Sequence, residues 1–228
     1  MIDSDSCFLH ETCVIYRKGK CIPSEFCLKL FKQNALFDEG LLTIPQRHRV
    51  ELRIDSDGTD KQSFVRLKTI EKDIENFVNN GCNLYLYSST CGNGKTSWAL
   101  RLIQSYIAKI WHKTDIRCRI LFINVPKFFI KLKENISHEN DYISHIRENV
   151  QNCDLVVWDD IGTKIGTDFE MENLLSIIDL RLSDNKANIY TSNISPELLS
   201  QRVGERLCSR ICKLSSIVEL RGKDKRGT

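Results

Sequence analysis

From Lys61 to the end of the chain, short apolar segments alternate with longer amphipathic stretches, and this alternation narrows the fold more than any other property of the sequence. Five segments are short and apolar enough to be buried strands: 83–88, 119–125, 154–159, 188–193 and 217–220. Stretches with apolar residues at helical spacing stand before and between them: 61–79, 96–111 and 169–182. The pattern predicts an α/β domain in which helices flank both faces of a parallel five-stranded sheet.

The first predicted strand leads into a glycine-rich loop and then an amphipathic helix. Residues 89–96 read STCGNGKT, which fits the phosphate-binding pattern GxxxxGK[ST] except that Ser89 replaces the first glycine. The glycines allow a tight turn whose amide groups bind phosphate oxygens, and the helix adds its positive N-terminal end. We expect Lys95 to bind the β- and γ-phosphates of ATP, and the Thr96 hydroxyl to bind Mg²⁺. The predicted nucleotide-binding residues are Gly92, Asn93, Gly94, Lys95, Thr96 and Ser97.

A second apolar segment ends in two carboxylates, at the Walker B position of P-loop enzymes. Asp159 is predicted to hold Mg²⁺ through water, and Asp160 to orient or deprotonate the attacking water. Asp160 is one methylene shorter than the glutamate found in many such enzymes, which favours slow hydrolysis. Asn193 ends the next strand, where its amide is expected to reach the lytic water or the γ-phosphate. The alternative for the two aspartates is an acidic strand end that faces solvent. The alternative for Asn193 is an ordinary turn residue at the end of a strand.

In their order and spacing these motifs resemble the DnaC/DnaI-type helicase loaders, a branch of the AAA+ ATPases that includes the IstB-like transposition helpers. The resemblance covers about residues 41–228 and rests on IPQRHR, STCGNGKT, VVWDDIG, YTSN, GERLCSR and GKDKR. It implies an ATP-dependent protein that delivers a hexameric DnaB-type replicative helicase onto single-stranded DNA. It also implies self-association through the ATPase domain. A loader of this length fits a phage-encoded protein as well as a host one.

Three arginines receive expected roles from the same resemblance. Arg210, in GERLCSR, matches the arginine finger that reaches the γ-phosphate of a neighbouring subunit, and Arg206 is its rival one turn earlier on the same helix face. Arg226, in GKDKR, resembles the sensor 2 arginine that contacts the nucleotide. The alternative for each is a solvated surface arginine. Two residues follow Arg226, so we expect no C-terminal helical lid.

Four of the ten cysteines fall within the first 27 residues, in a segment with few apolar side chains. Cys7, Cys13, Cys21 and Cys27 are the predicted zinc ligands, because Zn²⁺ bound by four thiolates stabilises segments too small to form a core. His10 is an alternative to one of them, and free thiols are the alternative to zinc. We therefore expect residues 1–40 to form a cysteine-rich module, 41–60 a linker and 61–228 the AAA+ ATPase domain. The resemblance to the helicase loaders implies that the cysteine-rich module docks on the helicase.

Charge and hydropathy limit the surroundings in which this chain works. The 33 basic and 30 acidic residues give a formal net charge of +3, which excludes a strongly basic nucleic-acid coat. No apolar run is long enough to span a membrane and no secretory signal is visible, so we expect a cytoplasmic protein. Residues 127–133 interleave lysines with aromatic residues, which suits single-stranded DNA but also an ordinary amphipathic helix. We expect the aromatic residues there to be buried and leave the role of the lysines open.

Two further functions compete with helicase loading. The first is a nucleotide-binding adaptor of a transposase or replication complex with little turnover, which Ser89 and Asp160 favour. The second is an unrelated zinc-bearing P-loop NTPase. Binding to a replicative helicase or to a transposase would distinguish the loader from the adaptor.

Overall fold

A computed structural model describes residues 18–19, 25–40 and 58–224. Five parallel strands form one sheet: β1 (Asn83–Tyr87), β2 (Ile120–Asn124), β3 (Leu155–Asp159), β4 (Ala187–Ser192) and β5 (Ser215–Glu219). Their order across the sheet is β2-β3-β4-β1-β5, so β1 lies between β4 and β5. The predicted parallel five-stranded sheet is confirmed. Because all strands are parallel, their carboxyl ends meet at one edge of the sheet.

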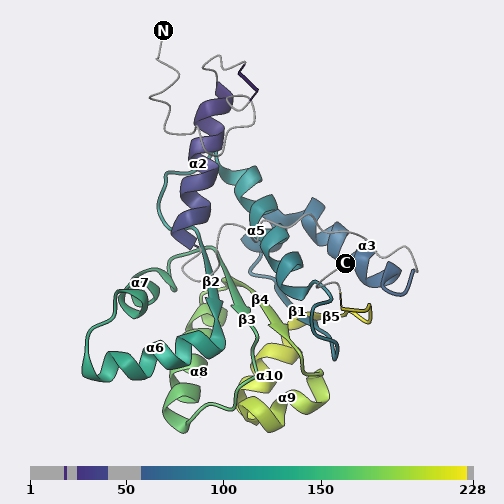
Figure 1. Cartoon of the computed structure of the whole chain (residues 1–228), viewed down its shortest axis with the longest axis vertical. Helices are drawn as coiled ribbons and strands as arrows, with labels where there is room; N and C mark the ends of the chain where they lie inside the picture. Colours follow the sequence, from purple (N-terminus) through teal and green to yellow (C-terminus); the bar gives the residue numbers. More distant parts are fainter. Residues whose placement is uncertain (1–17, 20–24, 41–57, 225–228) are drawn as a thin grey trace.

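Helices cover both faces of this sheet (Figure 1). Those packed on one face are α2 (Glu25–Gly40), α3 (Lys61–Lys72), α4 (Ile74–Asn79) and α5 (Lys95–Ile110). Those packed on the other are α6 (Val125–Ser137), α7 (Asp141–Asn149), α8 (Asp168–Ser183), α9 (Pro196–Val203) and α10 (Glu205–Lys213). The arrangement is a three-layer sandwich with two separate apolar cores.

Each strand contributes side chains to both cores in alternation. Leu84 and Leu86 of β1 belong to the core under α5, whereas Tyr85 between them belongs to the core under α8. In β3, Val157 belongs to the core under α5 and Trp158 to the core under α8. Strands β1 to β4 are therefore buried along nearly their whole length, whereas the edge strand β5 is buried only at Val218.

The predicted helix over 61–79 is interrupted at Asp73, which separates α3 from α4. Asp73 has φ −110° and ψ 30°, outside the helical region. Its carboxylate accepts a hydrogen bond from Asn76 Nδ2 at 2.7 Å. A short polar side chain that bonds to a neighbour in this way competes with continuous helix.

Helix α2, which the sequence places in the N-terminal module, packs on the apolar core of the α/β domain. Leu36 and Phe37 are buried in the same core as α5, and Lys32 Nζ donates to Thr114 O at 2.9 Å. Gly40 lies against Ile120, so closely that a Cβ there would collide with the Ile120 side chain. Figure 1 shows α2 ending beside β2 and projecting beyond the sheet. Since residues 1–17, 20–24 and 41–57 lie outside the described residues, the division into module, linker and ATPase domain stays a prediction.

A buried arginine fixes α8 to the amino ends of the strands. The Arg181 side chain is fully buried, and its guanidinium donates to Asn188 Oδ1 at 2.8 Å and to Ala187 O at 2.7 Å. It also donates to the carbonyls of Val150 and Cys153. Burial lowers the pKa of Arg181 from its ordinary value. These bonds hold α8 against the sheet at one end of the helix.

Among the described residues, no helix combines the length and the apolar character that crossing a membrane requires.

Candidate functional site

The loop between β1 and α5 lies at the carboxyl edge of the sheet, as the phosphate-loop prediction requires. Gly92 and Gly94 both have positive φ angles, 74° and 105°, which residues with a Cβ rarely adopt. Gly94 is also the N-cap of α5, so the helix begins at Lys95 with its amide groups directed toward the loop. These residues form a strand, a tight loop and a helix N-terminus, the geometry that binds phosphate.

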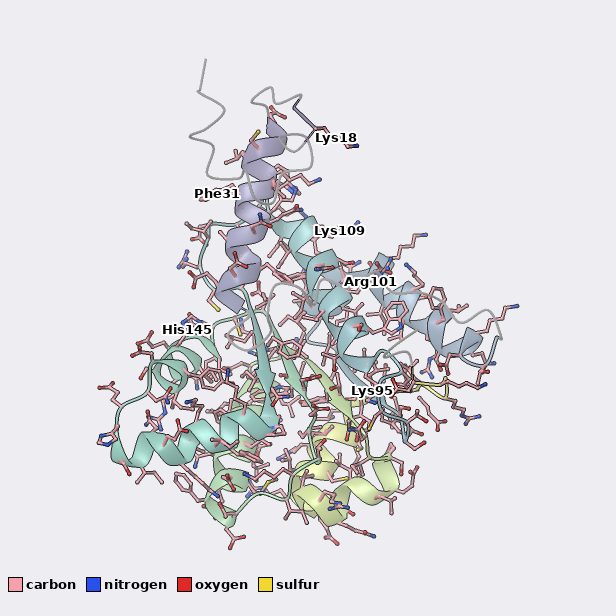
Figure 2. All side chains as sticks on the ribbon, in the orientation of Figure 1. Lys18, Phe31, Lys95, Arg101, Lys109 and His145 are labelled. Carbon is pink, nitrogen blue, oxygen red and sulfur yellow. The ribbon has the colours of Figure 1, made fainter. Side chains whose placement is uncertain are left out.

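Lys95 lies at the start of α5 with its ammonium group across the loop (Figure 2). The side chain is 6% exposed, and Nζ donates to Thr90 O at 3.2 Å and to Asn93 Oδ1 at 3.5 Å. The positive charge is therefore held against the loop by two of its oxygen atoms. Ser97 follows in the first turn of the helix and is half-buried.

Thr96 and Asp159 meet across the gap between the loop and β3. Thr96 Oγ1 donates to Asp159 Oδ1 at 2.9 Å, and Thr191 Oγ1 donates to the same oxygen at 2.7 Å. Asp159 is 4% exposed, and burial raises its pKa from 3.8 to about 6. The neighbouring carboxylate of Asp160 adds to this rise, and the hydrogen bonds from the surrounding hydroxyl and amide groups oppose it. The raised pKa indicates that the hydrogen bonds around Asp159 do not fully compensate the negative charge of its buried carboxylate.

Asp160 stands in a strained turn directly after β3. Its φ of 60° is uncommon for a residue with a side chain, and the turn is fixed by hydrogen bonds. The Asp160 N–H donates to Thr191 Oγ1 at 3.1 Å, and Asn124 Nδ2 lies 3.4 Å from Asp160 Oδ2 and 3.5 Å from Asp159 Oδ2. The half-buried carboxylate of Asp160 is thus held beside that of Asp159 by groups from β2 and β4.

The chain after β5 returns to the phosphate loop. Asn93 Nδ2 donates to Leu220 O at 3.1 Å, and the Asp60 carboxylate accepts from the N–H groups of Arg221 and Gly222 at 2.6 and 2.9 Å. The Asp224 carboxylate then lies so close to Gly92 that a Cβ there would collide with it. The C-terminal segment is therefore fastened beside the loop, while Arg226 itself lies outside the described residues.

Sequence reasoning missed two side chains that hold this site together. Asn124 ends the second strand and Thr191 precedes Asn193 by two residues, so both lie at the carboxyl edge where polar groups converge. Thr191 reaches both Asp159 and the Asp160 backbone. Asn193 follows the end of β4 and is half-buried, which places it at the correct edge. The sequence signal for Asn124 and Thr191 is that each is a polar residue at the carboxyl end of an apolar strand.

The two candidate finger arginines lie on one face of α10 and contact the same carboxylate of α8. Arg210 Nε lies 2.8 Å from Asp179 Oδ1, and Arg206 Nη2 lies 3.6 Å from Asp179 Oδ2. The Arg210 side chain is 50% exposed and that of Arg206 is 74% exposed. Both are surface groups that a second molecule can approach.

The predicted zinc ligands fall mostly outside the described residues. Cys7, Cys13, Cys21 and the alternative His10 all lie there, whereas Cys27 is a half-buried free thiol of α2. Within the part of the chain that the structure describes, no three histidine, cysteine or acidic side chains are grouped as metal ligands. The zinc site therefore stays a prediction.

Residues 127–133, whose pattern suits either single-stranded DNA or an ordinary amphipathic helix, lie in α6. Phe128, Phe129 and Leu132 are each 2% exposed or less, which confirms that the aromatic residues are buried. The lysines make contacts within the chain: Lys127 Nζ lies 5.2 Å from the centre of the Tyr142 ring, and Lys131 pairs with Glu134 at 2.6 Å.

The arrangement of donors and carboxylates suits a magnesium–nucleotide complex. The buried Asp159 carboxylate and the Thr96 hydroxyl are oxygen ligands of the kind that Mg²⁺ prefers. The adjoining loop amides, the Lys95 ammonium and the N-terminus of α5 are the groups that bind a chain of phosphates. The residues present therefore fit ATP and Mg²⁺.

Comparison with known proteins agrees with this geometry. Residues 61–215 match the family of bacterial DnaA ATPase domains. The crystal structure of the DnaC helicase loader is 19% identical with a TM-score of 0.60, over 82% of this chain and 98% of the loader. The DnaI structure is 22% identical with a TM-score of 0.57, over 80% and 94%. AMPPCP-bound DnaA from Aquifex aeolicus is 17% identical with a TM-score of 0.56, over 79% and 51%. No curated protein sequence gives a significant match.

Proposed function

This chain belongs to the family of bacterial DnaA ATPase domains, and on that premise we propose that it is an ATP-dependent loader of a replicative helicase. The observation that carries the ATPase part is the 2.9 Å contact between Thr96 Oγ1 and Asp159 Oδ1, which joins the phosphate loop to the strand-end carboxylates. The loader part is supported by the fold that the chain shares with DnaC and DnaI over nearly the whole length of each.

The phosphate loop binds the nucleotide in this proposal. The amides that follow Gly92 and Gly94 hold the phosphate oxygens, and Lys95 turns from Thr90 O and Asn93 Oδ1 to the β- and γ-phosphates. Thr96 and Asp159 would hold Mg²⁺, which neutralises charge on the β- and γ-phosphates when it is bound. Arg226 and Ser97 complete the set of nucleotide-binding residues.

Asp160 and Asn193 are assigned to the attacking water. The Asp160 carboxylate accepts a proton from this water as the water oxygen bonds to the γ-phosphorus and ADP leaves with the bridging oxygen. Asn124 and Thr191 keep the Asp160 turn in place by the hydrogen bonds already described. The short Asp160 side chain favours slow turnover, which suits a protein that uses ATP as a switch.

Arg210 completes the site from a second molecule. Its guanidinium is half-exposed on α10 and is assigned to the γ-phosphate of the neighbouring subunit, where it stabilises the charge that develops during transfer. Hydrolysis then depends on self-association. Arg206 is more exposed and lies farther from Asp179, and it is the second candidate.

The partners proposed for the rest of the chain are a hexameric helicase and single-stranded DNA. The cysteine-rich segment, with zinc bound by Cys7, Cys13, Cys21 and Cys27, is proposed to dock on the helicase. The ATPase domain is proposed to contact DNA. A transposase adaptor with little turnover is the alternative, because Ser89 departs from the P-loop pattern and Asp160 is short.

A binding experiment separates these two functions. The full chain is immobilised with ATP and Mg²⁺, and purified replicative helicase and purified transposase are offered at equal concentrations. A loader retains the helicase at micromolar concentration or below and does not retain the transposase. Retention of the transposase alone would replace the loader with the adaptor. Lys95→Ala serves as the nucleotide-free control.

A further inference from the structure

Asp179 of α8 faces both candidate finger arginines although it lies far from them in sequence. Its carboxylate is 23% exposed and contacts Arg210 Nε at 2.8 Å and Arg206 Nη2 at 3.6 Å. The two arginines are one turn apart on α10, where like charges repel. One carboxylate therefore compensates two positive charges on the surface assigned to the neighbouring subunit.

We infer that Asp179 is a positioning residue for the arginine finger Arg210, an inference that rests on the proposed function. The ion pair joins Asp179 to Nε, the nitrogen on the stem side of the guanidinium. The two terminal nitrogens carry four of the five N–H donors and form the fork that binds a phosphate. Pairing through Nε orients this fork without using it.

Both helices that carry the pair are fixed to the core. Asp179 lies next to Ile178 and two residues before Arg181, and both of these side chains are fully buried. On α10, the buried side chains of Leu207 and Ile211 belong to the same apolar core as Ile178. Because the two backbones are already held, formation of the ion pair has to order only the two side chains. An exposed arginine alone would have many rotamers and only a small fraction of them would reach a phosphate.

The pair also distinguishes Arg210 from Arg206. Arg210 makes the shorter contact and is the less exposed of the two, so its direction is the better defined. Arg206 lies at 3.6 Å, a distance at which the ion pair of an exposed arginine contributes little. We therefore expect Arg206→Ala to reduce ATP hydrolysis much less than Arg210→Ala.

Steady-state kinetics of the assembled protein tests the positioning role. Asp179→Asn keeps the size of the side chain and removes its charge, so we expect kcat to fall about tenfold with KM for ATP unchanged. Glu172→Gln, an exposed acid of the same helix, is the matched control and should keep the wild-type kcat. Asp179→Glu restores the charge and should recover most of the lost rate. A wild-type kcat in Asp179→Asn, or an equally slow Asp179→Glu, would overturn the inference, as would a fall in Tm much larger than that of the control.

Mixing experiments then show in which subunit Asp179 acts. Lys95→Ala protein supplies an intact finger and an intact Asp179, so adding it to Asp179→Asn should raise the rate above that of either protein alone. Adding Arg210→Ala protein to Asp179→Asn protein should not raise the rate, because the only Arg210 in the mixture then belongs to the subunit that lacks the Asp179 carboxylate. The opposite pattern refutes the inference.

If Arg210→Ala and Lys95→Ala do not complement each other, the trans finger of the proposed function fails. If they do complement while Asp179→Asn is not rescued by Lys95→Ala, only the positioning role fails.

Discussion

Replacing Asp159 by Asn is expected to stabilise the nucleotide-free protein while removing its magnesium ligand. The pKa of this buried carboxylate is raised from 3.8 to about 6, which corresponds to about 3 kcal/mol of unfavourable free energy when the group is ionised in the folded state. Asn is neutral like the protonated carboxyl, and the pKa of about 6 already includes the hydrogen bonds from Thr96 and Thr191, so their loss is not subtracted separately. The free energy of unfolding should therefore rise by up to about 3 kcal/mol, or up to about 6–12 °C in Tm for a chain of this length.

The pH dependence makes this prediction specific. Between pH 3.8 and about 6 the folded protein binds more protons at Asp159 than the unfolded chain does, so this group lowers wild-type stability as pH rises through that window. The advantage of Asp159→Asn should be small near pH 4.5 and complete above about pH 6.5. Thermal unfolding without nucleotide or Mg²⁺, at several pH values, measures it, with Glu172→Gln as the control. A variant less stable than wild type at pH 7.5, or a difference independent of pH, would refute the reasoning.

The remaining predictions concern nucleotide, water, zinc and the buried arginine. Lys95→Ala should lose affinity for a fluorescent ATP analogue and keep the fold by circular dichroism; unchanged binding would contradict the P-loop assignment. Asp160→Asn should bind ATP normally and hydrolyse it at least tenfold more slowly, and a normal rate would assign the water to another residue. Purified protein should contain about one zinc per chain by elemental analysis, lost when Cys21 and Cys27 are both changed to Ser; metal-free wild type would exclude the site. Arg181→Met should lower the free energy of unfolding by about 3–5 kcal/mol in a urea titration, since it leaves several buried carbonyls without donors, and a loss below about 1 kcal/mol would contradict the anchoring role.

Short sequence patterns predict those elements whose structure is determined by residues close together in the chain. Continuous apolar runs bounded by helices indicate buried parallel strands, and STCGNGKT indicates a loop because the glycine positions and the following helix lie within a few residues of one another. The five strands and the loop-to-helix turn at Lys95 are accordingly where the sequence places them. The meeting of Thr96 with Asp159 also follows, because parallel strands end at one edge of the sheet.

Contacts between distant segments could not be predicted in this way. The pairing of Asp179 with Arg210 depends on how α8 and α10 pack, and no periodicity or motif contains that information. The return of the C-terminal segment to Asn93 and Asp60 is equally non-local. Helix α2 was assigned to the cysteine-rich segment because of its neighbours in sequence, although Leu36 and Phe37 are buried on the ATPase core. The interruption at Asp73 was missed because the apolar spacing continues across it.

The most direct test of the central claim is a loading assay on closed circular single-stranded DNA coated with single-strand-binding protein. A ring-shaped helicase cannot thread onto such a circle, so displacement of an annealed labelled oligonucleotide reports loading. With the replicative helicase that the binding experiment retains, the wild-type chain and ATP should raise displacement severalfold above helicase alone, and Lys95→Ala should give no increase. Two results would contradict an ATP-dependent helicase loader. One is that the wild-type chain does not increase displacement, and the other is that Lys95→Ala increases it as much as wild type does.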